Sequence, residues 1–197
     1  MFELSSTDEF TVWLEQVDRE VRKRVLVRLA RAEMGNLGDH KLFGPIGEMR
    51  IDFGPGYRVY FTKREQRIIV LLCGGDKKTQ RRDIARATLM AAEVQVAALV
   101  TRPFSIADHL DDEGQSFMLD DAIAANDPAY LAHAIGTIAR ARGGLLTLER
   151  RTGIKRQTLA KSFGPDGNPT LATLLPVLKA LGLKLSIEPA DPAPVAA

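Results

Sequence analysis

Apolar positions in the first half of the chain repeat with two different periods. Between residues 8 and 34 they recur at the spacing of two successive helices, and Gly35 follows the second. A glycine-punctuated loop at 36–47 leads into three strand-like stretches and a closing helical pattern. These predicted strands and helix are 50–53, 57–62, 67–73 and 79–93. The order α-α-β-β-β-α predicts an α+β domain with two helices, a three- to four-stranded antiparallel sheet and a C-terminal helix.

Helical patterns fill most of the second half of the chain. Asp127-Pro128 is a helix start signal, and a leucine-rich helix begins at Thr170. Between them lie two short helical patterns, at 145–152 and 156–163, which are separated by Gly153. A helix, a glycine turn and a second helix are typical of the helix-turn-helix motif. The pattern therefore predicts an all-α second domain that contains such a motif.

Composition places the chain among small globular proteins. Its 197 residues suit one or two domains, and no apolar run is long enough to cross a membrane, so we expect a soluble cytoplasmic protein. Cys73 is the single cysteine, which excludes an intramolecular disulfide and a cysteine-based metal site. The three histidines lie far apart without ligand spacing. We therefore expect neither a metal nor a cofactor.

Four cations lie around the predicted strands and are named the sheet cations: Arg50, Arg58, Lys77 and Lys78. The two arginines flank the turn that Gly54-Pro55-Gly56 forces, and the two lysines follow the neighbouring strand. Such side chains often do no more than occupy the solvent face of a sheet. Because neither a Cys/His cluster nor a carboxylate pair accompanies them, the sheet cations also suit a phosphate backbone as partner.

RNA can be cleaved without a metal because its own 2′-hydroxyl is the nucleophile. The protein must align that hydroxyl with the phosphorus, stabilise the charge that develops on the phosphate and protonate the leaving oxygen. Arginines suit the charge stabilisation, and a lysine or tyrosine with a shifted pKa can act as acid or base. We expect Cys73 to be a buried strand residue and not a nucleophile.

The segment at 105–127 is acidic and contains no Lys or Arg. Its carboxylates include Asp108, Asp111, Asp112, Glu113, Asp120 and Asp121. Such a segment is most simply a solvated face. Beside a basic surface on the same chain it is also a candidate substrate mimic, because tethering gives it an effective concentration of roughly millimolar. We expect it to lie on or near the sheet cations. The alternative basic surface is the face of the second predicted helix with Arg24, Arg28 and Arg31, which is either solvated or holds RNA or an acidic partner.

Two parts of the sequence resemble the two components of an addiction module. GNLGDHKLFGPIGEMR, MRIDFGPGYRVYFTK and IIVLLCGGDKKTQRRDIARA resemble the small killer proteins of the RelE/ParE-like toxin superfamily near HigB, over about residues 1–90. The stretch from TRPFSIADHLDD through NPTLATLLPVLKALGLKLSI resembles HigA-like antidote proteins with a Cro-type helix-turn-helix, over about residues 101–188. The resemblance implies a toxin that cleaves messenger RNA, often on the ribosome. It also implies an antitoxin that blocks the toxin and represses the shared promoter.

The resemblance assigns expected roles to particular residues of the first half. Arg58, in GYRVYF, matches the sheet arginine that binds phosphate in ribonuclease members. Arg50 lies close to the position of a catalytic lysine, and the two lysines of the sheet cations lie in the loop of another functional cation. Tyr57 and Tyr60 are the nearby candidates for an acid or base, although either can simply pack. The predicted catalytic residues are Arg50, Arg58, Lys77, Lys78 and Tyr57, and the acids of 105–127 become the predicted toxin-neutralising residues.

The predicted recognition helix presents four polar residues for operator DNA: Arg156, Gln157, Thr158 and Lys161. Arg and Gln suit base edges, and Lys suits phosphate. Two residues depart from the motif. Glu149 stands where a small residue normally packs, and Lys155 replaces a Ser/Thr-type cap. The alternative is a helical bundle that no longer binds DNA.

The predicted domains are a toxin at 1–93, a linker at 94–104 and an antitoxin at 105–188, with the helix-turn-helix at about 144–163. Residues 183–187 are a candidate terminal strand, and 189–197 are expected to be a disordered tail. The expected partners are messenger RNA and the ribosome, operator DNA and a second copy of the chain, without a membrane. Two alternatives remain open: a DNA-binding regulator with a degenerate toxin domain, and a ParE-like toxin that acts on gyrase.

Overall fold

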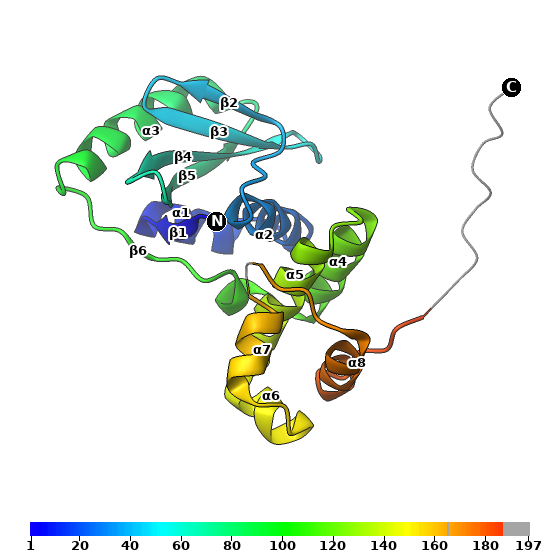
Figure 1. The fold of residues 1–197 in the computed structure, drawn as a ribbon. Helices are drawn as coiled ribbons and strands as arrows, with labels where there is room; N and C mark the ends of the chain where they lie inside the picture. The colour runs from blue at the N-terminus through cyan, green and yellow to red at the C-terminus, as the bar shows by residue number, and fades with distance from the viewer. Residues whose placement is uncertain (165, 187–197) are drawn as a thin grey trace, which may run out of the picture.

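A six-stranded mixed sheet with helices on both faces forms one end of the molecule, and a group of helices forms the other (Figure 1). The computed structural model describes residues 1–164 and 166–186. The strands are β1 (Glu3–Ser6), β2 (His40–Phe43), β3 (Ile46–Ile51), β4 (Tyr57–Arg64), β5 (Ile68–Asp76) and β6 (Arg102–Pro103). The helices are α1 (Asp8–Gln16), α2 (Arg19–Glu33), α3 (Gln80–Gln95), the 3-10 helix η1 (Ile106–His109), α4 (Asp112–Ala124), α5 (Pro128–Ala141), α6 (Gly144–Thr152), α7 (Arg156–Ser162) and α8 (Leu171–Ala180).

The strand order β2-β3-β4-β5-β1-β6 confirms the antiparallel β3-β4-β5 unit and corrects the rest of the predicted sheet. β1 pairs with β5 in parallel, so the prediction of three or four purely antiparallel strands is wrong. β2 lies within the predicted loop 36–47, and β5 continues through the two glycines to Asp76. The missed strands have two to four residues, too few for a period to be recognised in the sequence.

Helix caps explain several element boundaries. Thr7 accepts a hydrogen bond from the Phe10 N–H and starts α1. Asp127 accepts from the backbone of α5, whose first residue is the predicted Pro128. Leu183 to Ser186 form no strand, and the remaining residue of the candidate terminal strand and the predicted tail lie outside the described residues.

The two faces of the sheet bury different clusters of apolar side chains. α3 covers one face, where Met90 packs with Tyr60 and Leu72. α1 and α2 lie on the other face, where Val59 and Leu71 belong to a larger core. Alternation along each strand therefore decides which helix a side chain meets.

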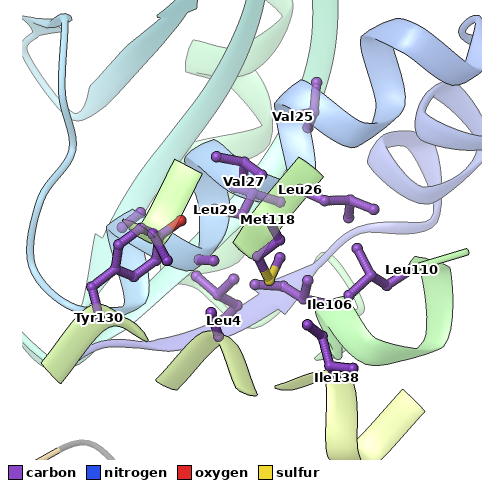
Figure 2. Packing of buried hydrophobic residues seen from close by; sticks show 14 of the residues in the cluster. Leu4, Val25, Leu26, Val27, Leu29, Ile106, Leu110, Met118, Tyr130 and Ile138 are labelled. Carbon is purple, nitrogen blue, oxygen red and sulfur yellow. The ribbon is translucent and has the colours of Figure 1, made fainter. Parts of the chain in front are cut away.

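The larger core continues through α2 into the second half of the chain. The apolar residues at helical spacing in α2 are buried, and so are three more of its residues. The first set is Val21, Val25, Leu26 and Leu29, and the second is Val27, Ala30 and Ala32. α2 is buried this widely because α4 contacts it and contributes to the same core as the sheet face. Figure 2 shows Met118 of α4 close to Leu26 of α2 and to Ile106, which follows β6. The two halves thus share one apolar core.

Glycines fix the geometry at the far end of the molecule. Gly143 and Gly153 adopt left-handed conformations on either side of α6, with φ of 100° and 72°. A Cβ at Gly136 of α5 would meet the Phe163 carbonyl oxygen at 2.3 Å, so only glycine lets the chain after α7 approach α5 this closely. The helix, turn and helix predicted at 144–163 are present as α6 and α7.

Candidate functional site

A buried carboxylate that the sequence did not single out contacts two of the four sheet cations, Arg50 and Arg58. Glu48 of β3 is fully buried, and the strand register places it opposite Tyr60 while Arg50 lies opposite Arg58. Glu48 accepts hydrogen bonds from Arg50 Nε at 2.9 Å, Tyr60 Oη at 3.1 Å and Gln80 Nε2 at 2.8 Å. The Glu48 cluster consists of Glu48, Arg50, Arg58, Tyr60 and Gln80. The bond to Glu48 raises the pKa of Arg50, and burial followed by Glu48 raises the pKa of Tyr60.

Arg58 is held on two sides and retains only 10% exposure of its side chain. Its Nη1 donates to the Gly56 carbonyl at 2.7 Å. Its Nε lies 3.4 Å from Glu48 Oε2, an ion-pair contact that leaves this N–H without a hydrogen bond. Glu48 thus balances much of the charge on Arg58 and fixes the position of its guanidinium.

Gly56 brings Arg58 and Lys77 to the same place. A Cβ built on Gly56 would lie 3.6 Å from Arg58 Nη1 and 3.9 Å from Lys77 Cβ. The glycine has φ of 79°, a conformation that β-carbons disfavour, so this turn requires it. Lys77 and Lys78 are exposed, and the Asp76 carboxylate accepts the Lys78 backbone N–H at 2.7 Å. Arg58, Lys77 and Lys78 therefore meet at one end of the β3-β4-β5 unit.

The two tyrosines occupy different environments from each other. Tyr57 lies beside Arg58 in β4, so its side chain points to the opposite face and packs against the larger core. Tyr60 points to the Glu48 cluster and is fully buried. Only Tyr57 has exposed surface, and it does not share the face of the Glu48 cluster.

The acidic segment binds α2 and not the sheet cations. Arg19 Nε lies 2.6 Å from Asp111, Lys23 lies 3.0 Å from Glu113, and Arg31 donates to both carboxylate oxygens of Asp121 at 2.6 and 2.8 Å.. The prediction that this segment lies on the sheet cations is therefore wrong, because α4 packs by its apolar side on α2. Of the three arginines on the alternative basic face of α2, Arg31 meets an acid, whereas Arg24 lies against aromatic rings and Arg28 donates to the Leu37 carbonyl at 3.3 Å.

The structure separates the six predicted neutralising acids. Asp111, Glu113 and Asp121 pair with α2, as described, and Asp112 pairs with Arg142 at 3.2 Å. Within 1–164 and 166–186, Asp108 and Asp120 form no ion pair. Although burial acts in the opposite direction, the Gly114 N–H and Arg19 hold the pKa of Asp111 below its ordinary value.

Aromatic and histidine contacts that the sequence reasoning missed complete this interface. Arg24 of α2 lies between the rings of Phe53 and Phe117, 4.3 and 5.1 Å from their centroids. His133 of α5 is buried, and its Nε2 lies 2.9 Å from Glu33 Oε2. Their partners are distant in sequence, so no local spacing could have indicated these pairs.

The four predicted DNA-binding residues are all exposed on α7: Arg156, Gln157, Thr158 and Lys161. Leu159 and Phe163 anchor the other side of the helix in the core. Glu149 Oε1 accepts the Arg156 N–H at 3.0 Å, so the acid that departs from the motif replaces the cap that Lys155 does not supply.

Other chemical groups are accounted for by the fold. Cys73 is buried, as predicted, and burial followed by Glu9 raises the pKa of its thiol to about 12. Among the described residues, no three His, Cys, Asp or Glu side chains are arranged to hold a metal ion. None of the helices described in the structure has the length and apolar character needed to cross a bilayer.

Comparisons with known proteins divide the chain in two. Residues 12–95 match the family described as "Phage derived protein Gp49-like", and residues 100–189 match the family described as "Probable addiction module antidote protein". Two proteins of Haemophilus influenzae (strain ATCC 51907 / DSM 11121 / KW20 / Rd), both named "Uncharacterized protein", are similar to parts of the chain. One is 39% identical over 94 residues, which is 47% of this chain and 95% of that protein. The other is 34% identical over 88 residues, which is 44% of this chain and 90% of that protein.

No solved structure matches the chain. The two family matches nevertheless agree with the layout of the structure, since the first spans α1 to α3 and the second spans β6 to α8. The chain belongs to the toxin–antitoxin proteins, with a Gp49-like segment followed by an addiction module antidote segment.

Proposed function

We propose that the chain is a fused HigB-like toxin and HigA-like antitoxin of the cytoplasm. Its first part is a metal-independent endoribonuclease that cleaves messenger RNA on the ribosome, and its second part keeps that activity silent. The observation that carries the proposal is the meeting of Arg58 and Lys77 around Gly56, with Lys78 exposed beside them. Cations gathered on a rigid sheet suit a phosphate, and the Gp49-like match supports a toxin.

The exposed lysines and the fixed arginine have different roles at the scissile phosphate in this proposal. Lys77 and Lys78 are exposed and approach the phosphate first, while Arg58, fixed by Glu48 and Gly56, presents preorganised donors to the charge that develops. The 2′-hydroxyl of the RNA attacks the phosphorus, so the chain supplies no nucleophile. Lys77, exposed beside Arg58 at the Gly56 turn, is the group that can carry a proton, because Tyr57 points to the opposite face of the sheet.

Silencing in this proposal acts through α2. Acids of α4 and of its N-cap pair with Arg19, Lys23 and Arg31, whose charges would otherwise attract RNA or the ribosome. The carboxylates thus mimic a substrate on α2, where they take the place of phosphates, and they leave the Arg58 site uncovered.

Expression of residues 1–99 tests the ribonuclease. Its induction is expected to stop growth and to create new RNA 5′ ends in messenger RNA, which the full chain does not. Arg58→Ala should remove both effects, because it takes away the fixed phosphate donors. Arg64→Ala, an exposed arginine at the other end of β4, is the matched control and should change neither. Growth arrest with intact RNA and relaxed chromosomal DNA would overturn the proposal in favour of a gyrase poison.

The second part is proposed to bind operator DNA as a homodimer. α7 presents Arg156 and Gln157 for base edges and Lys161 for phosphate. α8 exposes Leu171 and Leu175 one turn apart, and such a stripe suits pairing with a second copy, which a palindromic operator requires.

A mobility shift with the DNA upstream of the coding sequence tests this role. Replacing both Arg156 and Gln157 by Ala is expected to weaken specific binding about 5- to 150-fold, since one good bidentate base contact contributes roughly 1–3 kcal/mol. Arg64→Ala removes one charge far from α7 and should leave the ratio of specific to non-specific binding unchanged. Equal affinity for operator and unrelated DNA would contradict a repressor role.

A further inference from the structure

A cleft lies beside the Gly56 turn at which Arg58 and Lys77 meet. Trp13, Tyr57, Gly74, Gly75 and Arg82 line its part nearest the turn. It continues between α1 and α3 past Cys73, with a volume of about 410 Å³ in this inner part. That volume lies within the range of roughly 300–1,000 Å³ that is usual for ligand pockets.

The strand arrangement opens this cleft. β1 pairs with β5 only as far as Ser6 and Leu71, and the chain then turns away into α1. Beyond that point β5 carries two glycines. A Cβ on Gly74 would lie 2.2 Å from the Trp13 ring, and a Cβ on Gly75 would lie 2.0 Å from Asp83 Oδ2. Gly74 therefore lets the indole lie directly on the strand backbone, and Gly75 lets Asp83 of α3 approach the same strand from the other face.

The lining combines an aromatic ring with a largely exposed cation. Trp13 is partly buried and is steadied by Phe10, whose ring centroid lies 5.7 Å away. The Arg82 side chain is 81% exposed at the rim. The three acids that line the cleft are already engaged. Glu9 accepts from Arg86 at 2.8 Å, and Asp76 accepts the Lys78 N–H at 2.7 Å. Asp83 accepts from the Thr79 hydroxyl and lies 3.7 Å from Arg82 Nε. An aromatic face next to a cation is how proteins hold unpaired bases with their phosphates.

The position of the cleft connects it to the proposed cleavage site. Tyr57 lines the cleft and is the residue before Arg58, and the register pairs Tyr57 with Asp76, the residue before Lys77. A ligand in this cleft would thus lie at the end of β5 that leads into Lys77, while the Arg58 side chain points to the other face of the sheet. No residue of the described second half lines the cleft, so residues 1–164 and 166–186 leave it open.

We propose that this cleft binds one unpaired nucleobase of the RNA substrate, stacked on Trp13, with a neighbouring phosphate on Arg82. The proposal rests on the proposed ribonuclease function and assigns it a base-binding subsite next to the scissile phosphate. Stacking accepts any base, so Trp13 contributes affinity for an unpaired base of any sequence.

Trp13 is the single tryptophan of the chain, so its fluorescence reports on this cleft alone. The probe is a short unstructured RNA with 2′-O-methyl groups, which binds but cannot be cleaved, added to the full-length protein. We expect saturable quenching of Trp13 that follows binding measured independently by anisotropy of a labelled copy. Trp13→Ala should weaken binding about 5- to 150-fold, because stacking of one base contributes roughly 1–3 kcal/mol.

Arg82→Ala keeps the test decisive if loss of Trp13 disturbs folding. Arg82 is exposed, so the variant should fold normally while both the RNA affinity and the extent of quenching fall; Arg64→Ala should alter neither. Binding by anisotropy without any quenching, or with equal affinity for Arg82→Ala and Arg64→Ala, overturns the subsite, as does absence of binding. Quenching in a protein whose first part cleaves no RNA in cells would instead overturn the proposed ribonuclease and leave the subsite standing.

Discussion

Reversal of three carboxylates in the full-length chain, Asp111, Glu113 and Asp121 to Lys, is expected to produce a protein that stops bacterial growth. Each of the three faces a cation on α2, so reversal replaces attraction by repulsion at every position. The variant loses three attractions and gains three repulsions across one pair of helices, so the contact of α4 with α2 should weaken.

The matched control for this reversal is Asp120→Lys. Asp120 belongs to the same helix and is exposed, and within the described residues it forms no ion pair. The control should grow normally. Addition of Arg58→Ala to the triple variant should restore growth, which ties the toxicity to the sheet and not to a misfolded protein. Colony formation after induction measures the effect, and hydrogen exchange shows whether α4 has left α2. A triple variant with α4 displaced that grows as well as the control would contradict silencing through α2.

The sequence predicted the long elements of the sheet because they carry a full period. β4 and β5 have eight and nine residues with β-branched and aromatic side chains, whereas β1 and β6 have four and two. The alternation along β3 could also have placed Glu48 on the same face as Arg50. It could not have shown that Glu48 is buried, since burial comes from α3 and its first residue, Gln80.

The charge of the acidic segment did not determine which basic surface it binds. Its sign indicated a basic partner, but Arg24, Arg28 and Arg31 and the sheet cations offered equivalent charge in the sequence. The choice depends on Met118, which is fully buried in the core that α4 shares with α2. Apolar packing therefore selected the partner, and the ion pairs followed from it.

Glu48→Ala is expected to destabilise the protein by about 3–5 kcal/mol, because it leaves buried partners of the carboxylate unpaired. Tyr60 is fully buried and would lose its acceptor, and Arg58, at 10% exposure, would lose its counter-charge. For a chain of this length, such a loss corresponds to a melting temperature lower by roughly 6–20 °C. Thermal and urea denaturation of the full-length protein measure it.

Glu15→Ala provides the control, since Glu15 is exposed on α1 and its loss should change stability by no more than about 0.5 kcal/mol. Glu48→Gln keeps the shape of the side chain but removes its charge. Its loss of unfolding free energy should therefore lie between those of Glu48→Ala and Glu15→Ala. A cost below about 1 kcal/mol for Glu48→Ala would show that the cluster is hydrated in solution. The same variants test whether Glu48 also serves the reaction. If Glu48→Gln folds but no longer supports RNA cleavage, then Glu48 acts by fixing the Arg58 guanidinium. The most buried charge of the sheet would then position the phosphate-binding residue.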